Sequence, residues 1–363
     1  MKTHTWLFAA LLGASLLVPR AGWSVGFADE LDLPAIISPL AQHRLINGLA
    51  FAGKRLVAVG ERGHILVSDE QGRHWRQVAD PVRSDLVAVS FANARKGWAV
   101  GHDGVVLTTS DGGNTWTKQF DGRQAARAMA DYYAEHPPAI AAGSHDSAAA
   151  IMRDVKRDLA QGPDKPFLDV CFENERTGFI VGAFNLIFRT EDGGRHWLPW
   201  FDRTDNPRRL HLYSVREIAG EWYVVGEQGL VMKLDRKAER FRALPTPYHG
   251  TFFGIVGNAR ALLVYGLRGT LLRSTDGGGH WQPVDSGLRV ALTASTVMPD
   301  GRIVIVSQAG DVLVSRDDGA SFVHQTVAQP LPAAAVLAAG ADELITGGLR
   351  GVAIETFKSP EQP

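Results

Sequence analysis

Charged and aromatic residues recur at turns along the chain. Side chains of these types could bind an anion or the surface of a partner protein. Five turns have the form Gly-x-x-Gly and begin at Gly60, Gly101, Gly226, Gly266 and Gly348. These turns, with segments 204–209 and 245–249, supply Arg62, His102, Asp103, Arg208, Arg209, Glu227, Tyr248, His249, Arg268 and Arg350. Mixed charge and aromatic rings suit a docking surface, although any one charged turn residue is more often simply solvated.

The elements that position these residues repeat about every 41 residues, the spacing from Gly60 to Gly101. Looser copies of the turn stand at 182–185 and 307–310. Each repeat holds three or four short alternating strands, and the repeats begin near Leu45, Leu86, Phe167, Leu210, Thr251, Val290 and Ala333. Such a period predicts an all-β, seven-bladed β-propeller over residues 29–363.

A second marker, the Asp-box, recurs with the pattern Ser/Thr-x-Asp-x-Gly-x-x-Trp. An aspartate accepts hydrogen bonds from nearby N–H groups in a tight turn, and the glycine tolerates a positive φ. The key residues are Glu70, Asp111, Asp192, Asp276 and Asp317, with Trp75, Trp116, Trp197 and Trp281. Glutamate replaces aspartate in the first box, and Phe322 replaces tryptophan in the last. We expect a structural role for these residues, neither catalytic nor metal-binding.

Residues 121–166 break the period between blades 2 and 3. Apolar residues at helical spacing predict helices over Gln124–Glu135 and Asp146–Gln161, hence a helical hairpin on the rim. His136, His145 and Asp146 lack the tight spacing of metal ligands. We therefore expect no metal and no cofactor.

The N-terminus is typical of a secretory signal. Residues 1–28 carry Lys2, an apolar run over residues 6–18 and small residues before a cleavage point near Ala28. Export to the periplasm, or to an equivalent lumen, is the prediction, with no membrane span left after cleavage. Residues 29–44 should close the ring, with Leu33–Leu40 supplying the outer strand that the seventh repeat lacks.

Strand order places the candidate residues on one face. In a four-stranded blade, the turn between strands two and three lies on the same face as the connection to the next blade. We call this face, which carries the Gly-x-x-Gly turns and the insertion, the Gly-turn face. The Asp-boxes lie on the opposite, Asp-box face.

The chain resembles the photosystem II stability/assembly factor family. The resemblance rests on Gly97–Gly101 (Gly-Trp-Ala-Val-Gly) and on the box Thr109–Trp116, and covers residues 40–357. It implies an exported seven-bladed propeller that binds newly made membrane protein during photosynthesis, as a chaperone-like factor. The insertion departs from photosynthetic members and is more similar to the version in non-photosynthetic proteobacteria.

These patterns predict a non-enzymatic, monomeric binding protein whose partner is a membrane protein complex or its unassembled subunit. Nucleic acid is not expected, because 38 Lys and Arg balance 39 Asp and Glu. The alternative is a sialidase-like glycan-binding or glycoside-hydrolysing propeller, in which Arg62, Arg268 and Arg350 hold a carboxylate beside Tyr248. Against it, sialidases are usually six-bladed and carry an Arg-Ile-Pro motif absent here. A third hypothesis makes the insertion the contact surface.

Overall fold

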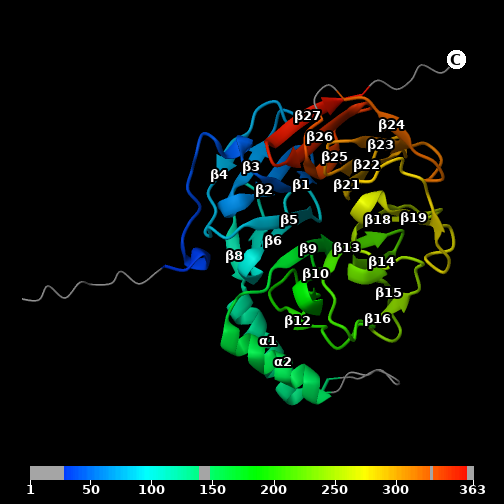
Figure 1. Ribbon diagram of the computed structural model, residues 1–363. Helices are drawn as coiled ribbons and strands as arrows, with labels where there is room; N and C mark the ends of the chain where they lie inside the picture. The colour runs from blue at the N-terminus through cyan, green and yellow to red at the C-terminus, as the bar shows by residue number, and fades with distance from the viewer. Residues whose placement is uncertain (1–27, 139–147, 328–329, 358–363) are drawn as a thin grey trace, which may run out of the picture.

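The computed structural model describes residues 28–138, 148–327 and 330–357. Seven antiparallel sheets surround a central axis, one behind the next along the chain (Figure 1). The seven-bladed β-propeller predicted from the repeat is confirmed. None of the described helices is long and apolar enough to span a membrane.

Each blade runs outward from an inner strand at the axis (Figure 1). The inner strands are β1 Ile46–Ala52, β5 Leu86–Phe91, β9 Phe167–Phe172, β13 Leu212–Ile218, β17 Phe252–Gly257, β21 Leu292–Val297 and β25 Ala333–Ala338. The second strands are β2 Arg55–Gly60, β6 Gly97–Gly101, β10 Gly178–Gly182, β14 Glu221–Gly226, β18 Leu262–Gly266, β22 Ile303–Ser307 and β26 Glu343–Gly348.

The third strands are β3 Ile65–Ser68, β7 Val106–Thr109, β11 Ile187–Thr190, β15 Val231–Asp235, β19 Leu271–Ser274, β23 Val312–Ser315 and β27 Gly351–Thr356. Six blades end in an outer strand: β4 Arg76–Val78, β8 Thr117–Phe120, β12 Leu198–Pro199, β16 Arg240–Leu244, β20 Gln282–Pro283 and β24 Val323–Gln325. Each inner strand begins within two residues of the repeat start that the sequence predicts.

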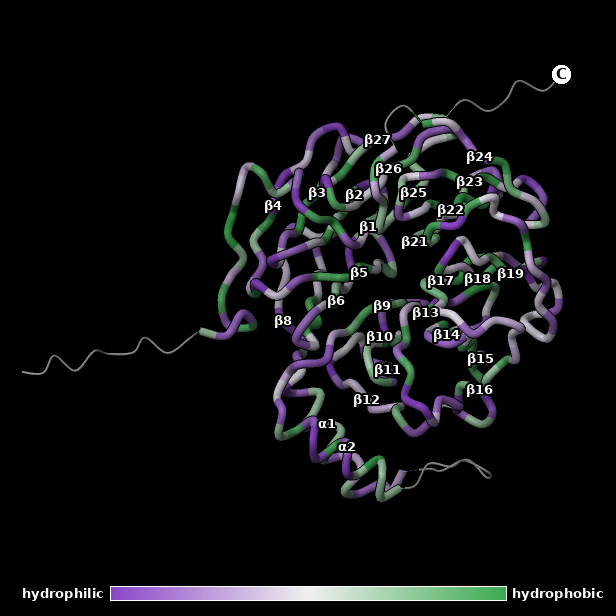
Figure 2. Tube along the Cα trace, in the orientation of Figure 1, coloured by the Kyte–Doolittle hydropathy of each residue, from purple (hydrophilic) through white to green (hydrophobic). Residues whose placement is uncertain are grey.

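The core consists of layers between neighbouring blades. The second strands are its centre, and all five residues of β6 and of β10 are buried. Trp98 on β6 stacks on Phe172 of the next blade, with ring centroids 3.4 Å apart. Both faces of a middle strand are covered by adjacent sheets, which explains the continuous apolar runs (Figure 2).

The Asp-box turns join the third and outer strands. In blade 2, the Asp111 carboxylate accepts the Thr115 N–H at 3.0 Å and the Thr109 hydroxyl at 2.8 Å. The Gly113 N–H donates to the Thr109 hydroxyl at 3.0 Å. Asp192, Asp276 and Asp317 accept the equivalent N–H bond from the residue four positions later. Glu70 accepts a bond from the His74 ring instead.

The insertion forms two helices, α1 Gly122–Glu135 and α2 Ala148–Gln161, beside blades 2 and 3 (Figure 1). Asp121 caps α1 by accepting the N–H groups of Arg123 and Gln124 at 3.0 and 3.1 Å. Met129 and Tyr133 of α1 are buried in the same core cluster as Trp98 and Phe172. The predicted start of the second helix, with His145 and Asp146, lies outside the described residues.

Contrary to the sequence expectation, Leu33–Leu40 forms no strand on blade 7. The described part of that blade has three strands, β25, β26 and β27. The segment lies instead against blade 1, where the Ala35 N–H donates to the Asp80 carbonyl at 3.0 Å. Pro34 and Pro39 lack an N–H, which makes the segment a poor partner in a sheet.

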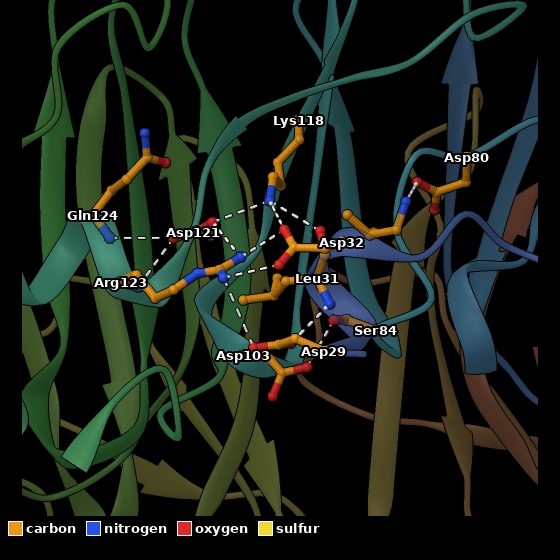
Figure 3. A network of polar contacts seen from close by, with 11 residues as sticks. Asp29, Leu31, Asp32, Asp80, Ser84, Asp103, Lys118, Asp121, Arg123 and Gln124 are labelled. Atoms are coloured by element: carbon orange, nitrogen blue, oxygen red, sulfur yellow. Dashed lines mark hydrogen bonds and ion pairs between the residues drawn. The ribbon is translucent and has the colours of Figure 1, made fainter. Parts of the chain in front are cut away.

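Residues 29–43, which we call the N-terminal strap, are anchored at their start by a polar network (Figure 3). Arg123 of α1 donates to both carboxylate oxygens of Asp32, at 2.9 and 3.0 Å. The Arg123 guanidinium holds the pKa of Asp32 at about 2. Lys118 donates to the Leu31 carbonyl at 2.9 Å, and the Leu31 side chain is buried in the core between blades 1 and 2.

Candidate partner-binding site

The Gly-x-x-Gly turns share one unusual backbone geometry. In five turns the third residue is not glycine and yet has a left-handed φ of 53–58°. These residues are Arg62, Asp103, Phe184, Gln228 and Arg268, of which Phe184 lies in a looser copy of the turn. Such a conformation costs about 1 kcal/mol for a residue with a Cβ. In blade 1 the fourth residue must lack a Cβ, because a Cβ on Gly63 would lie 2.3 Å from the Val82 carbonyl oxygen.

The acidic residues of this face are engaged within the fold. Ser84 donates to the Asp103 carboxylate at 2.6 Å, and Glu227 accepts the His211 N–H at 2.8 Å. Asp85, in the connection from blade 1 to blade 2, accepts the Arg62 N–H at 2.7 Å. These hydrogen bonds fix the turns against their neighbours.

Several residues predicted for the docking surface are also held by contacts within the fold. Arg209 forms an ion pair with Asp154 of α2, and Arg208 donates to the Gln228 side chain. The Tyr248 hydroxyl donates to the Leu267 carbonyl at 3.3 Å, and in the described chain it has no carboxylate partner. Arg209 thus joins the insertion to the Gly-turn face.

The remaining residues predicted for the docking surface are available for contact with a partner. Within the residues that the structure describes, five side chains make no hydrogen bond or ion pair and are exposed: Arg62, His102, His249, Arg268 and Arg350. The three arginines come from blades 1, 5 and 7, in turns on the same face. Three of these five exposed side chains, those of Arg62, Arg268 and Arg350, carry a positive charge.

Apolar residues that we did not predict stand beside these cations. Phe184, Leu267, Val290 and Leu349 are 50%, 38%, 37% and 65% exposed. Leu267 and Leu349 directly precede Arg268 and Arg350 in their turns, so the turn pattern itself was a sufficient signal. Exposed apolar groups beside free cations are typical of a protein-docking surface.

A row of rings leads from Phe184 toward the axis. The Lys165 ammonium lies 5.5 Å from the Phe184 ring centroid, and the His211 ring lies 4.5 Å from that of Phe184. Tyr213 on β13 follows at 6.3 Å from His211, and Phe253 on β17 at 5.4 Å from Tyr213. The row offers a partner side chain a series of rings to stack on, from Phe184 to the inner strands.

The inner strands contribute a charge pair between a buried aspartate and an exposed arginine. The Asp169 carboxylate on β9 accepts the Val170 and Val215 N–H groups at 2.9 and 2.8 Å, and pairs with Arg216 on β13. Burial raises the pKa of the nearby Cys171 thiol to about 11. No cluster of three or more metal-ligating side chains occurs among the described residues.

The sequence of the chain is similar to that of known proteins. Residues 54–133 and 156–246 match the family model described as "Photosynthesis system II assembly factor YCF48". Over these residues the chain is similar to photosystem II assembly factors. Residues 134–155, between the two matched ranges, fall within the insertion, and residues 1–53 and 247–363 also lie outside the match.

Two curated relatives are similar to parts of the chain. "Photosystem II assembly lipoprotein Ycf48" of Synechococcus sp. (strain CC9902) is 26% identical over 166 residues, 44% of this chain and 50% of the relative. "Photosystem II stability/assembly factor HCF136, chloroplastic" of Cyanidioschyzon merolae is 35% identical over 83 residues, 21% of this chain and 19% of the relative. The matched part thus spans half or less of each relative.

Solved structures share the fold. A structure titled "YCF48 bound to D1 peptide" has a TM-score of 0.61 at 15% identity and covers 90% of this chain and 100% of that one. The structure of YCF48 from Cyanidioschyzon merolae has a TM-score of 0.59 at 16% identity, covering 88% of this chain and 97% of the other. At these identities the likeness shows the propeller fold alone.

Proposed function

We propose that this protein is a non-enzymatic, exported assembly factor that holds a segment of a membrane protein subunit on its Gly-turn face. The observation that carries the proposal is the pairing of free arginines with exposed apolar residues in the same turns, Leu267 with Arg268 and Leu349 with Arg350. A segment that combines apolar side chains with carboxylates would complement both.

The relatives support this reading. One solved relative is described as bound to a D1 peptide, and another relative is described as a lipoprotein, which is an exported class. The sequence of residues 1–28 is likewise typical of an export signal. The membrane partner, the cleavage near Ala28 and the monomeric state are part of the proposal.

The candidate residues of the Gly-turn face would bind the segment by complementary charge and shape and would catalyse no reaction. Arg62, Arg268 and Arg350 would attract the acidic segment and fix its orientation. The rings of Phe184, His211, Tyr213 and Phe253 would receive an apolar or aromatic side chain of the partner. Asp103, Glu227 and Arg209 would keep the turns and the insertion in place, because their side chains are already bonded within the fold.

The test is crosslinking of the mature protein to the membrane fraction of its own host, followed by identification of the captured subunits. The test variant carries Arg62→Glu, Arg268→Glu and Arg350→Glu. The matched control carries Arg73→Glu, Arg95→Glu and Arg195→Glu, three exposed arginines of the opposite, Asp-box face. We expect one integral membrane complex to be captured by the wild type and the control and lost from the test variant. Equal capture by all three would refute the proposed face.

A further inference from the structure

Blade 7 differs from the other six blades at its outer edge. Each of those blades has four strands, whereas β27 is the last strand of blade 7 in the described part of the chain. The outer strands elsewhere span two to five residues, from β12 to β16, and β27 spans six. A long edge strand without lysine or proline is a template for another strand.

The neighbouring blade also lacks a cover at this point. The Asp-box tryptophans Trp116, Trp197 and Trp281 are 5%, 6% and 8% exposed. Each of them packs with a residue from the outer strand of the preceding blade, as Trp197 does with Phe120 of β8 at 6.4 Å between ring centroids. Trp75, which faces blade 7, is only half-buried.

A buried carboxylate lies on the face of β27 that is turned away from Trp75. Glu355 of β27 is 7% exposed and has no hydrogen bond or ion pair with any described residue. Its strand partner Leu344 and its neighbour Phe357 belong to the core cluster between blades 6 and 7. Burial raises the pKa of Glu355, as expected for a carboxylate that lacks a partner.

We propose that the edge of β27 is a second docking surface, which accepts an extended strand from a partner protein. The strand would place apolar side chains toward Trp75 and a lysine or arginine toward Glu355. It would run antiparallel to β27, as the outer strands of the other six blades do to their third strands. Main-chain hydrogen bonds would provide affinity, and the alternating side chains would provide specificity.

The charge of Glu355 favours a cation-bearing partner strand over the N-terminal strap and over a second copy of β27. The N-terminal strap carries no lysine or arginine over residues 29–43, and its contacts with Asp80 and Arg123 hold it elsewhere. A second copy of β27 would bring no cation either, because residues 351–357 contain none. The short helix at Ala41–His43 contacts the Gly351 end of the edge, and within the described chain β27 pairs with β26 alone.

The test uses the full chain and a capped peptide that alternates threonine with valine and has one central lysine in a threonine position. Hydrogen–deuterium exchange of residues 352–356 reports the docking, and fluorescence anisotropy of the labelled peptide gives the affinity. We expect the peptide to slow exchange at these amides. A central glutamate should weaken binding by about tenfold in the wild type.

Glu355→Lys should reverse this preference, so that the glutamate peptide binds more tightly. Glu135→Lys, at an exposed position on α1, is the matched charge control and should behave as the wild type. Three results would overturn the proposal. They are unchanged exchange at residues 352–356, an unreversed preference in Glu355→Lys, and amides already protected before peptide is added, which would mean that the chain covers its own edge.

Discussion

The hydroxyl of Tyr133, on helix α1, donates a 2.7 Å hydrogen bond to the carboxylate of Asp202, which lies in the connection that leaves blade 3. The Asp202 N–H returns a bond to the same hydroxyl at 3.3 Å. Both residues are buried, and burial together with the Asp202 charge holds the pKa of Tyr133 well above its usual value. This pair fixes the insertion to the rim of the propeller.

Tyr133→Phe should therefore lower the free energy of unfolding by about 1–2 kcal/mol, because it leaves a buried carboxylate with one donor fewer. Urea denaturation followed by far-UV circular dichroism measures the change. Tyr132→Phe is the matched control, since the Tyr132 hydroxyl makes only a 3.3 Å contact with Arg203. Equal losses in the two variants would contradict a special role for the Tyr133–Asp202 pair.

The Asp-boxes offer a second comparison within the chain. Asp111→Ala removes the acceptor of the Thr115 N–H and of two hydroxyls, and should destabilise the protein by about 1–2 kcal/mol. Glu70→Ala removes only an exposed contact with His74 and should change stability by less than about 0.5 kcal/mol. Thermal unfolding of both variants gives the answer. If Glu70→Ala lowered the stability as much as Asp111→Ala does, the hydrogen bonds of the Asp111 side chain would not be what stabilises the turn.

Repeated local signals made the propeller predictable from the sequence. Gly60 and Gly101 mark equivalent turns because each ends the second strand of its blade, and the blades follow from their spacing. The insertion helices were predictable for the same reason, from apolar residues at helical spacing. These signals are local, and neighbouring residues determine them.

Contacts between distant residues were not predictable. No pattern in Leu33–Leu40 shows that it lies against Asp80 rather than β27, because the choice depends on bonds to residues about 40 positions away. The engagement of Arg209 by Asp154 is of the same kind. The residues predicted for the docking surface lie together on the Gly-turn face, but the sequence did not distinguish side chains bonded within the fold from those that are not.

Cys171 allows a test of burial at the inner strands. Its pKa of about 11 leaves roughly 0.1% thiolate at pH 8, about a hundredfold less than at the ordinary value of 9.0. Alkylation by iodoacetamide at pH 8 should be at least about a hundredfold slower in the folded protein than in urea. Because the chain has one cysteine, mass spectrometry of the intact protein follows the reaction directly. Similar rates in the two states would contradict the burial of this thiol.

Asp80, beneath the N-terminal strap, should make stability depend on pH. Its side chain is 2% exposed, one carboxylate oxygen accepts the Val82 N–H at 3.0 Å, and the other has no partner in the described chain. Burial raises the pKa of Asp80 from 3.8 to about 8. The folded protein therefore keeps a proton that the unfolded chain releases between these two values.

The sign of the effect follows from this difference in bound protons. Stability that Asp80 contributes is fully present below about pH 4 and is lost as the pH rises toward 8, with a slope of at most about 1.4 kcal/mol per pH unit. Asp80→Asn mimics the protonated carboxyl, so it should exceed the wild type in stability by a margin that grows over this window. Urea unfolding at a series of pH values measures the margin, with the exposed Asp131→Asn as control. A margin that stays constant or shrinks with rising pH would mean that Asp80 is ionised in the fold, and that the strap covers it less tightly than its contacts indicate.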